Sequence, residues 1–362
     1  MILFFCSSVF HIINAINIKW HLHPDEDADL LLDGLADFSE LIEPLKKCGF
    51  FRSIQIPPYK AFHEHNKGRW GTANLDIENP ESFIGSLKFD REYNDYYCFV
   101  SSVYDKIIYY TLVKRGMNPR LHIAEEGISS YVTSIRTRSR SDQYDHKLYG
   151  KNAYMDNISS LLLYEPDLYC VGEGFPVQKI PKLDATNSAM MSIFSNIFGS
   201  ISFPQEKYIF LEESFLKDKI LATDKSLLNQ VAEFVGMDNI VIKLHPRNTV
   251  DTWSSRGFKT LGITNVPWEI AMLSNDIAEK TFITVSSGAA LSALISMSKN
   301  VKILLLYEMI DIGENAQVKQ KYFRNFIQKA KTIYNNIEPQ IFTPSGSSML
   351  QESLKYLNRR LK

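Results

Sequence analysis

The chain has 362 residues, of which 45% are hydrophobic and 22% are charged, as in ordinary soluble globular proteins. Its 40 lysines and arginines balance 41 aspartates and glutamates, so no global field attracts nucleic acid, and we expect no nucleic-acid partner. The length suffices for two domains of roughly 150 residues each. Four cysteines without Cys-x-x-Cys spacing, an apolar start interrupted at Ser7, and no apolar run of about 18 residues predict a cytoplasmic protein without a spanning helix.

Strand-like and helical patterns alternate along the first half of the chain. Apolar, β-branched runs predict strands at residues 2–5, 29–32, 51–56, 97–100, 120–124 and 168–171. Helical spacing of apolar residues predicts helices within 9–16, 38–47 and 104–115. Residues 59–94 are polar and are interpreted as an elaborated loop. This alternation predicts a largely parallel sheet.

The alternation restarts in the second half. Strands are predicted at 208–211, 240–244, 282–285 and 301–306, and helices at 225–235, 267–273 and 289–297. We therefore predict an α/β protein with two Rossmann-like domains facing a central cleft, the GT-B-like architecture of many glycosyltransferases. The predicted parts are an N-terminal domain over 1–175, a linker over 176–206, a C-terminal domain over 207–345 and a basic amphipathic helix over 346–362.

The cluster Glu125-Glu126-Gly127 directly follows the predicted strand at 120–124. Ligands bind beyond the carboxyl ends of the strands in open α/β sheets, so these carboxylates lie where a site is expected. Adjacent carboxylates repel, and such a pair can supply a general base when it is partly buried. Gly127 would let the backbone turn sharply beside a substrate. The alternative is a solvated turn whose glutamates complement the dipole of a following helix.

A second cluster, His245-Pro246, follows the predicted strand at 240–244. The proline favours an extended conformation for His245, which fixes the direction of its ring. Lys243 and Arg247 flank the pair, so its surroundings suit an anion such as a phosphate. The alternative is a strand end with ordinary surface charges.

A third cluster, Ser286-Ser287-Gly288, joins the predicted strand at 282–285 to the predicted helix at 289–297. Hydroxyls and free backbone N–H groups at the start of a helix form an anion site. A serine N-cap without any ligand is the alternative. Glu269, on the predicted helix at 267–273, is a carboxylate that could accept hydrogen bonds from ribose hydroxyls.

The three clusters occur in order, each at a strand-to-helix junction, and in this the chain resembles bacterial sialyltransferases, in particular glycosyltransferase family 52. That family of lipooligosaccharide and capsule sialyltransferases carries a D/E-D/E-G motif, a His-Pro motif and a Ser/Thr pair. The corresponding residues here are Glu125-Glu126-Gly127, His245-Pro246 and Ser286-Ser287. The opening segment Phe4 to Ala15 also looks like the family's first strand and loop, with Ser7, Ser8 and Asn14 as candidate cleft residues.

The resemblance implies an inverting, metal-independent transfer of sialic acid from CMP-sialic acid to a hydroxyl of an acceptor glycan. A terminal galactose of a bacterial surface oligosaccharide or capsule is the expected acceptor. By analogy Glu125 deprotonates this hydroxyl, Glu126 is the alternative base, and His245 stabilises the leaving phosphate. The donor site implied by the resemblance and the neighbouring charges comprises Lys243, His245, Pro246, Arg247, Glu269, Ser286, Ser287 and Gly288.

No metal or cofactor is expected. Asp25-Glu26-Asp27 has the D-x-D spacing of metal-dependent glycosyltransferases, but it precedes a strand, so we interpret it as a solvated loop. Two other functions stay open: a related transferase using another CMP-keto-sugar or a UDP-hexose, and a non-catalytic nucleotide-sugar-binding subunit. The sequence is also compatible with a homodimer.

The C-terminal end has an amphipathic pattern. One helical face carries Leu350, Leu354, Leu357 and Leu361, and the last residues include Lys355, Arg359, Arg360 and Lys362. Such a helix can lie on an anionic membrane surface, which would place the protein peripherally on the inner face of the bacterial membrane. The alternative is that the leucines dock on the N-terminal domain while the cations complement the helix dipole.

Overall fold

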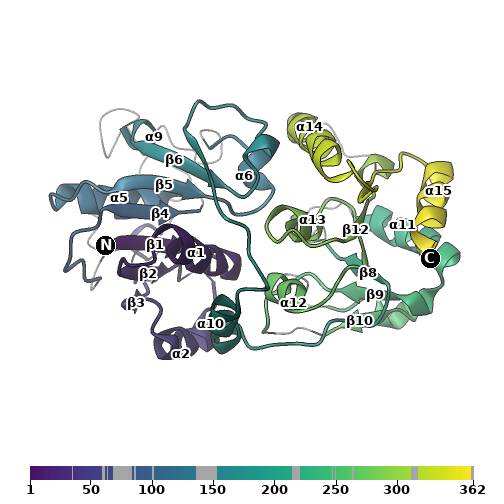
Figure 1. Cartoon of the computed structure of the whole chain (residues 1–362), viewed down its shortest axis with the longest axis horizontal. Helices are drawn as coiled ribbons and strands as arrows, with labels where there is room; N and C mark the ends of the chain where they lie inside the picture. Colours follow the sequence, from purple (N-terminus) through teal and green to yellow (C-terminus); the bar gives the residue numbers. More distant parts are fainter. Residues whose placement is uncertain are drawn as a thin grey trace. The chain divides into compact units, whose positions relative to one another are not determined.

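The computed structural model describes residues 1–34, 36–58, 62, 64–67, 84, 87–99, 102–135, 153–213, 221–246, 248, 250–262, 265–310 and 317–359. Most of the predicted loop at 59–94 lies outside these residues. The chain forms two compact units (Figure 1). Unit 1 contains Met1–Pro181 and Thr186–Gly199, and unit 2 contains Lys182–Ala185 and Ser200–Lys362.

The described part of unit 1 is built on a parallel sheet with the strand order β3-β2-β1-β4-β5-β6-β7. Its strands are β1 (Ile2–Cys6), β2 (Ala28–Leu32), β3 (Ser53–Gln55), β4 (Asp95–Cys98), β5 (Arg120–Ala124), β6 (Ile158–Leu163) and β7 (Val177–Lys179). Its helices are α1 (Val9–Leu22), α2 (Ser39–Cys48), α5 (Val103–Lys114), α6 (Ser129–Val132), α9 (Ala153–Asp156) and α10 (Ser188–Phe198), with a short η1 (Pro166–Leu168). Strands β1, β2 and β4 are buried along their whole length, as expected for parallel strands covered on both faces.

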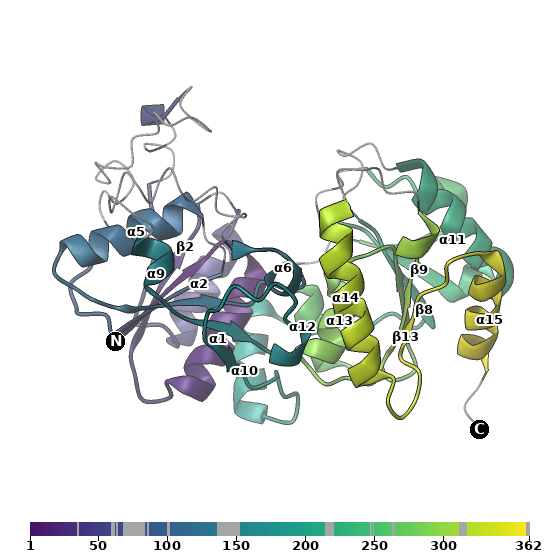
Figure 2. The same ribbon diagram turned by 90° about the horizontal axis from the view of Figure 1, so that it is seen from above.

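The described part of unit 2 is also built on a parallel sheet, with the strand order β10-β9-β8-β11-β12-β13. Its strands are β8 (Tyr208–Leu211), β9 (Ile240–Lys243), β10 (Lys259–Leu261), β11 (Thr281–Thr284), β12 (Lys302–Leu305) and β13 (Ile341–Phe342). Its helices are α11 (Leu221–Val235), α12 (Trp268–Ser274), α13 (Gly288–Ile295), α14 (Gln317–Tyr334) and α15 (Ser347–Asn358), with short η3 (Met237–Asn239), η4 (Ser254–Arg256) and η5 (Tyr307–Met309). Figure 2 shows α13 and α14 on one face of this sheet and α11 and α15 on the other.

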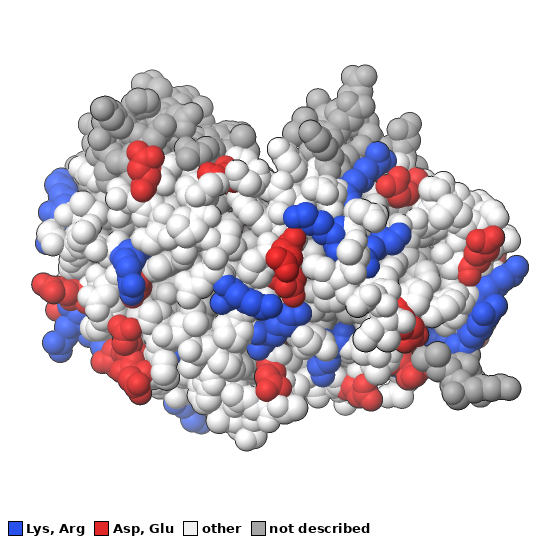
Figure 3. Space-filling view, turned by 45° about the horizontal axis from the view of Figure 1, so that its top comes forward, with Lys and Arg blue, Asp and Glu red and all other residues white. Residues whose placement is uncertain are grey.

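In each sheet the direction in which successive strands are added reverses beside the first strand. The reversal lies between β1 and β4 in unit 1 and between β8 and β11 in unit 2. This is the switch point at which doubly wound sheets bind ligands. The prediction of two Rossmann-like domains is therefore confirmed. On the face drawn in Figure 3, basic and acidic side chains are interspersed, in keeping with the net charge of −1.

The region around the predicted linker differs from the expectation. Residues 168–171 form no strand, because Pro166 begins the short helix η1, and the strand of this region is β6. Within the expected linker at 176–206, β7 pairs with β6, and α10 contacts α2 in unit 1. Strand β7 has three exposed residues and gives no apolar run, whereas α10 carries the buried residues Met190, Phe194, Ile197 and Phe198 and was not predicted as a helix.

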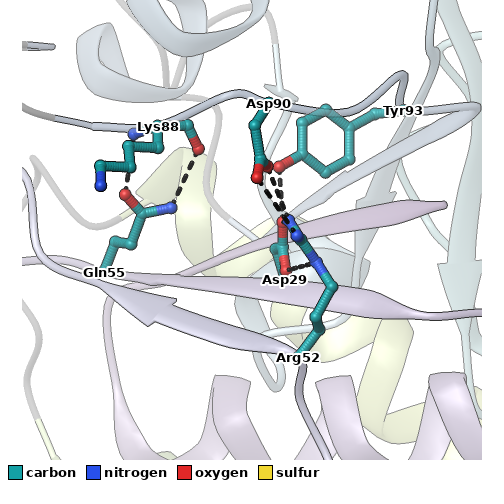
Figure 4. Close-up of polar contacts among 6 residues, drawn as sticks. All are labelled: Asp29, Arg52, Gln55, Lys88, Asp90 and Tyr93. Carbon is teal, nitrogen blue, oxygen red and sulfur yellow. Dashed lines mark hydrogen bonds and ion pairs between the residues drawn. The ribbon is translucent and has the colours of Figure 1, made fainter.

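An ion pair between the buried Asp29 and the more exposed Arg52 joins β2 to the start of β3 in unit 1 (Figure 4). The Asp29 side chain is fully buried in β2 and accepts a 2.9 Å hydrogen bond from Arg52 Nε and a 2.6 Å hydrogen bond from the Tyr93 hydroxyl. Arg52 also donates to Asp90 at 3.0 Å. These bonds connect the segment before β4 to the edge of the sheet.

Replacing Asp29 by alanine is expected to lower the free energy of unfolding of unit 1 by about 3 kcal/mol, because Arg52 and Tyr93 lose their buried acceptor. Chemical denaturation followed by circular dichroism measures this loss. The control is Asp90→Ala, whose side chain is 57% exposed, so that the substitution should change stability much less than Asp29→Ala does. Equal losses in the two variants would contradict this account.

The C-terminal helix α15 belongs to the core of unit 2. Leu350, Leu354 and Leu357 are buried against a cluster that includes Phe210 and Val231. The prediction that the helix docks on the N-terminal domain is therefore wrong, and these leucines are not available to a membrane. Leu361, Arg360 and Lys362 lie outside the described residues. Among the helices of the described part, none is long and apolar enough to span a bilayer.

We expect Leu354→Ala to destabilise unit 2 by about 2–5 kcal/mol, because it opens a cavity at a fully buried position. The matched control is Glu352→Ala on the exposed face of the same helix, with an effect within about 0.5 kcal/mol. Thermal unfolding compares the two variants. A Leu354→Ala protein as stable as the control would show that α15 is not part of the core.

Candidate functional site

Two of the predicted donor clusters, His245-Pro246 and Ser286-Ser287, lie at the switch point of unit 2. Strands β9 and β11 both pair with β8, so the carboxyl ends of these three strands are adjacent. The polar groups that follow them are Glu212-Glu213 after β8, His245 after β9 and Ser286-Ser287 after β11. The structure thus brings the His-Pro and Ser-Ser clusters to neighbouring strand ends, with an additional carboxylate pair between them.

Glu213 binds the strand end at β11. Its Oε1 accepts a 2.8 Å hydrogen bond from the Thr284 hydroxyl and a second hydrogen bond from the backbone N–H of Ser286. Its Oε2 accepts from the Ser286 hydroxyl at 2.9 Å. Burial raises the pKa of Glu213, while the donors on Ser286 and Thr284 oppose this shift. Both polar groups of Ser286 that were predicted to hold a phosphate are therefore directed at Glu213.

Glu212 orients the segment that carries His245. One carboxylate oxygen accepts from the backbone N–H of His245 at 2.9 Å, and the other accepts from the Trp253 indole N–H at 2.8 Å. Glu212 is buried, whereas His245 is half-buried and Pro246 is exposed. Because Glu212 is anchored at both oxygens, the backbone of His245 is fixed where β9 ends.

Ser287 and Gly288 begin α13. Ser287 is the N-cap, and its hydroxyl accepts from the N–H of Ala289 at 3.4 Å. The N–H of Ser287 donates to the Thr284 hydroxyl at 3.2 Å. The start of this helix is a region of positive electrostatic potential. It is the part of the predicted anion site that Glu213 does not occupy.

Lys243 and Glu269 lie on neighbouring elements of unit 2 and interact electrostatically. Burial lowers the pKa of Lys243, and the charges of Glu269 and Glu212 partly offset this decrease. Burial also raises the pKa of Glu269. The Lys243 ammonium lies 5.5 Å from the centroid of the Trp268 ring. Arg247 lies outside the described residues.

In unit 1 the two adjacent glutamates have different surroundings. Glu125 is only 3% exposed, and one of its carboxylate oxygens accepts hydrogen bonds from the Tyr131 hydroxyl and, at 2.9 Å, from the backbone N–H of Tyr164. Glu126 is half-buried, and its N–H donates to the Ser130 hydroxyl at 2.9 Å. Gly127 has φ of 117°, a conformation that favours glycine, and it turns the chain from β5 toward α6.

The three candidate cleft residues at the start of the chain have structural contacts. Ser8 is the N-cap of α1 and accepts from the N–H of His11 at 3.2 Å. The N–H of Ser7 donates to His11 Nδ1 at 3.1 Å. Asn14 is not in a loop: it is fully buried within α1, where it donates to the carbonyl of Glu125 at 2.7 Å and accepts from the Tyr164 hydroxyl at 2.7 Å. Asn14 therefore supports the Glu125 strand end from inside the unit.

The metal-ligating side chains that lie together in the described part of the chain are His23, Glu26 and Asp95, with ligand atoms within 4.8 Å of one another. Asp95 is the first residue of β4, so this group lies at the amino edge of the sheet, opposite the Glu125 strand end. Asp95 also binds His122 at 2.8 Å and Arg120 at 2.9 Å. Burial raises the pKa of Asp95, but these two partners outweigh burial and bring it to about 2.

No protein-family model matches the sequence, and no curated protein matches it significantly. Solved structures do match. The structure of Arabidopsis thaliana UGT89C1 complexed with UDP has a TM-score of 0.56 at 10% identity, covering 99% of this chain and 90% of that chain. The fold is GT-B. A structure of the same protein complexed with UDP-L-rhamnose has a TM-score of 0.51 at 10% identity, covering 100% of this chain and 90% of that chain.

Two residues at the end of β8, Glu212 and Glu213, were not among the predicted site residues. Their signal is the same as that of Glu125 and Glu126: two glutamates directly after an apolar strand. Because β8 is the first strand of unit 2, the pair lies at the switch point, where ligand-binding groups are expected.

Proposed function

We propose that the protein is a glycosyltransferase that takes its donor from a nucleotide sugar. One observation carries this proposal: His245, the start of α13 and a carboxylate pair meet at the switch point of a Rossmann-like unit in a GT-B fold. A leaving phosphate at the start of α13 would be stabilised by backbone N–H groups and by the hydroxyl of Ser287. These groups are fixed before the reaction, so they can stabilise charge as it develops.

For the donor, we propose CMP-sialic acid, because the motifs Glu125-Glu126-Gly127, His245-Pro246 and Ser286-Ser287 occur in the order found in the family that the sequence resembles. A UDP-sugar is the second candidate, because the GT-B structures with similar folds contain UDP or UDP-L-rhamnose. The expected acceptor is a glycan hydroxyl, such as that of a terminal galactose. A non-catalytic nucleotide-sugar-binding role is less consistent with a half-buried histidine held at the strand end.

The proposed reaction needs a donor site and a base. Unit 2 binds the donor, with His245 donating a hydrogen bond to the leaving phosphate and Glu269 binding the ribose. A glutamate of the Glu125-Glu126 pair removes the proton from the acceptor hydroxyl, whose oxygen attacks the anomeric carbon while the bond from this carbon to the phosphate oxygen breaks and the nucleotide leaves. Glu126 is the better candidate for this base, because Glu125 is buried and already accepts two hydrogen bonds. We propose that these groups act without a divalent metal ion.

Calorimetric titration of the full chain with CMP and with UDP tests the donor assignment. CMP is expected to bind at least about tenfold more tightly, and CMP-sialic acid should be transferred to galactose-terminated glycans in the presence of EDTA. If the protein binds UDP more tightly than CMP, the donor is a UDP-sugar. Failure to bind either nucleotide, with no transfer from either donor, would contradict the proposed function.

A further inference from the structure

Glu213 fills an anion position at the switch point of unit 2. Three donors converge on its carboxylate: the Thr284 hydroxyl at 2.8 Å, the Ser286 hydroxyl at 2.9 Å and the Ser286 N–H. Two hydroxyls and a backbone N–H are also the groups that commonly surround a bound phosphate oxygen. The protein thus places a carboxylate where one phosphate group could otherwise bind.

The neighbouring carboxylate cannot exchange roles with Glu213. Glu212 is 7% exposed, and its two oxygens are held by the His245 N–H at 2.9 Å and by the Trp253 indole at 2.8 Å. The nearby cation Lys243 interacts with Glu212 and Glu269. Glu213 is therefore the carboxylate that faces the turn between β11 and α13.

A fixed negative charge at this turn has different consequences for donors with one and with two phosphates. A single phosphate can bind at the start of α13, beside Ser287 and Gly288, and benefit from the positive end of the helix. A second phosphate would need further hydrogen-bond donors, but the hydroxyls of Ser286 and Thr284 already donate to Glu213. It also brings additional negative charge close to the carboxylate, and like charges a few ångströms apart repel strongly near a protein surface.

We propose that Glu213 is a specificity-determining residue that restricts the donor to a sugar linked through one phosphate, a nucleoside monophosphate sugar. It does so by occupying the anion position that the second phosphate of a nucleoside diphosphate would need. This inference rests on the proposed function and deepens it, because it favours CMP-linked over UDP-linked donors on grounds independent of the base.

Titration with CMP and CDP tests the inference, because the two ligands share the base and ribose and differ by one phosphate. Calorimetry of the full chain in metal-free buffer should show that the wild type binds CMP at least about tenfold more tightly than CDP. Glu213→Gln keeps the size of the side chain and removes its charge, and it should reduce this ratio to about threefold or less, mainly through tighter binding of CDP. Glu233→Gln on the exposed face of α11 is the matched control and should keep the wild-type ratio.

The outcomes separate the inference from the proposed function. A wild type that binds CDP as tightly as CMP, or a Glu213→Gln variant that keeps the wild-type ratio, overturns the inference while nucleotide binding stands. If none of CMP, CDP, UMP and UDP binds, the proposed function fails and the inference fails with it. Thermal unfolding shows whether Glu213→Gln is folded; if it is not, the wild-type ratio decides the question.

Discussion

Glu126→Gln is expected to lower kcat by about 10²-fold or more while leaving the affinity for CMP unchanged. The substitution keeps the size of the side chain and removes the group that would accept the proton of the acceptor hydroxyl. Glu126 is half-buried at the carboxyl end of β5, so a substrate can reach it. Initial rates with CMP-sialic acid, together with calorimetric titration of CMP, separate the loss of chemistry from a loss of binding.

The matched comparison is Glu125→Gln at the adjacent position. Glu125 accepts hydrogen bonds from Tyr131 and Tyr164 on one carboxylate oxygen in the interior, so an amide there would replace its other, buried oxygen by an NH2 donor. We expect this variant to lose stability, with a lower unfolding temperature, and to keep most of its activity per folded molecule. The opposite pattern, with normal turnover in Glu126→Gln and a loss of about 10²-fold in a stable Glu125→Gln, would identify Glu125 as the base.

His245→Ala is expected to reduce kcat by about 10²- to 10³-fold and to weaken CMP binding, because the leaving phosphate loses its donor. Folding should be little affected, since Glu212 binds the backbone N–H of His245, which the variant retains. Steady-state kinetics and thermal unfolding measure the two effects.

Added imidazole provides a control for the role of the ring. It should partly restore the activity of His245→Ala and should have no effect on Glu126→Gln. If His245→Ala retained near-normal turnover, the histidine would have no part in the reaction and the switch point of unit 2 would need another donor.

Most of the strands were predictable from the local sequence, although β10 and β13 were not predicted. Parallel strands that are covered on both faces are near-continuous apolar runs, and β1 and β8 stand out in this way, whereas β5 and β11 each include polar residues. The expected positions of Glu125, His245 and Ser286 at strand ends followed from the same runs. Strands β6 and β7 were missed, since one contains a Ser-Ser pair and the other is three exposed residues.

Whether each polar group is buried and hydrogen-bonded depends on partners that are far away in the sequence. Tyr164, whose backbone N–H donates to the carboxylate of Glu125, is 39 residues from it, and Ser286 is 73 residues from Glu213. No local pattern records such a pair, because the hydrogen bond exists only once the sheet has brought the two segments together. The leucines of α15 are a further case: their spacing predicted an apolar face, but packing against Phe210 and Val231 decided what that face contacts. The sequence by itself determined which residues end the strands, because the apolar runs show where each buried strand stops. The tertiary structure decided which of these residues are held by internal hydrogen bonds and which are exposed enough to meet a substrate, because both depend on segments far apart in the chain.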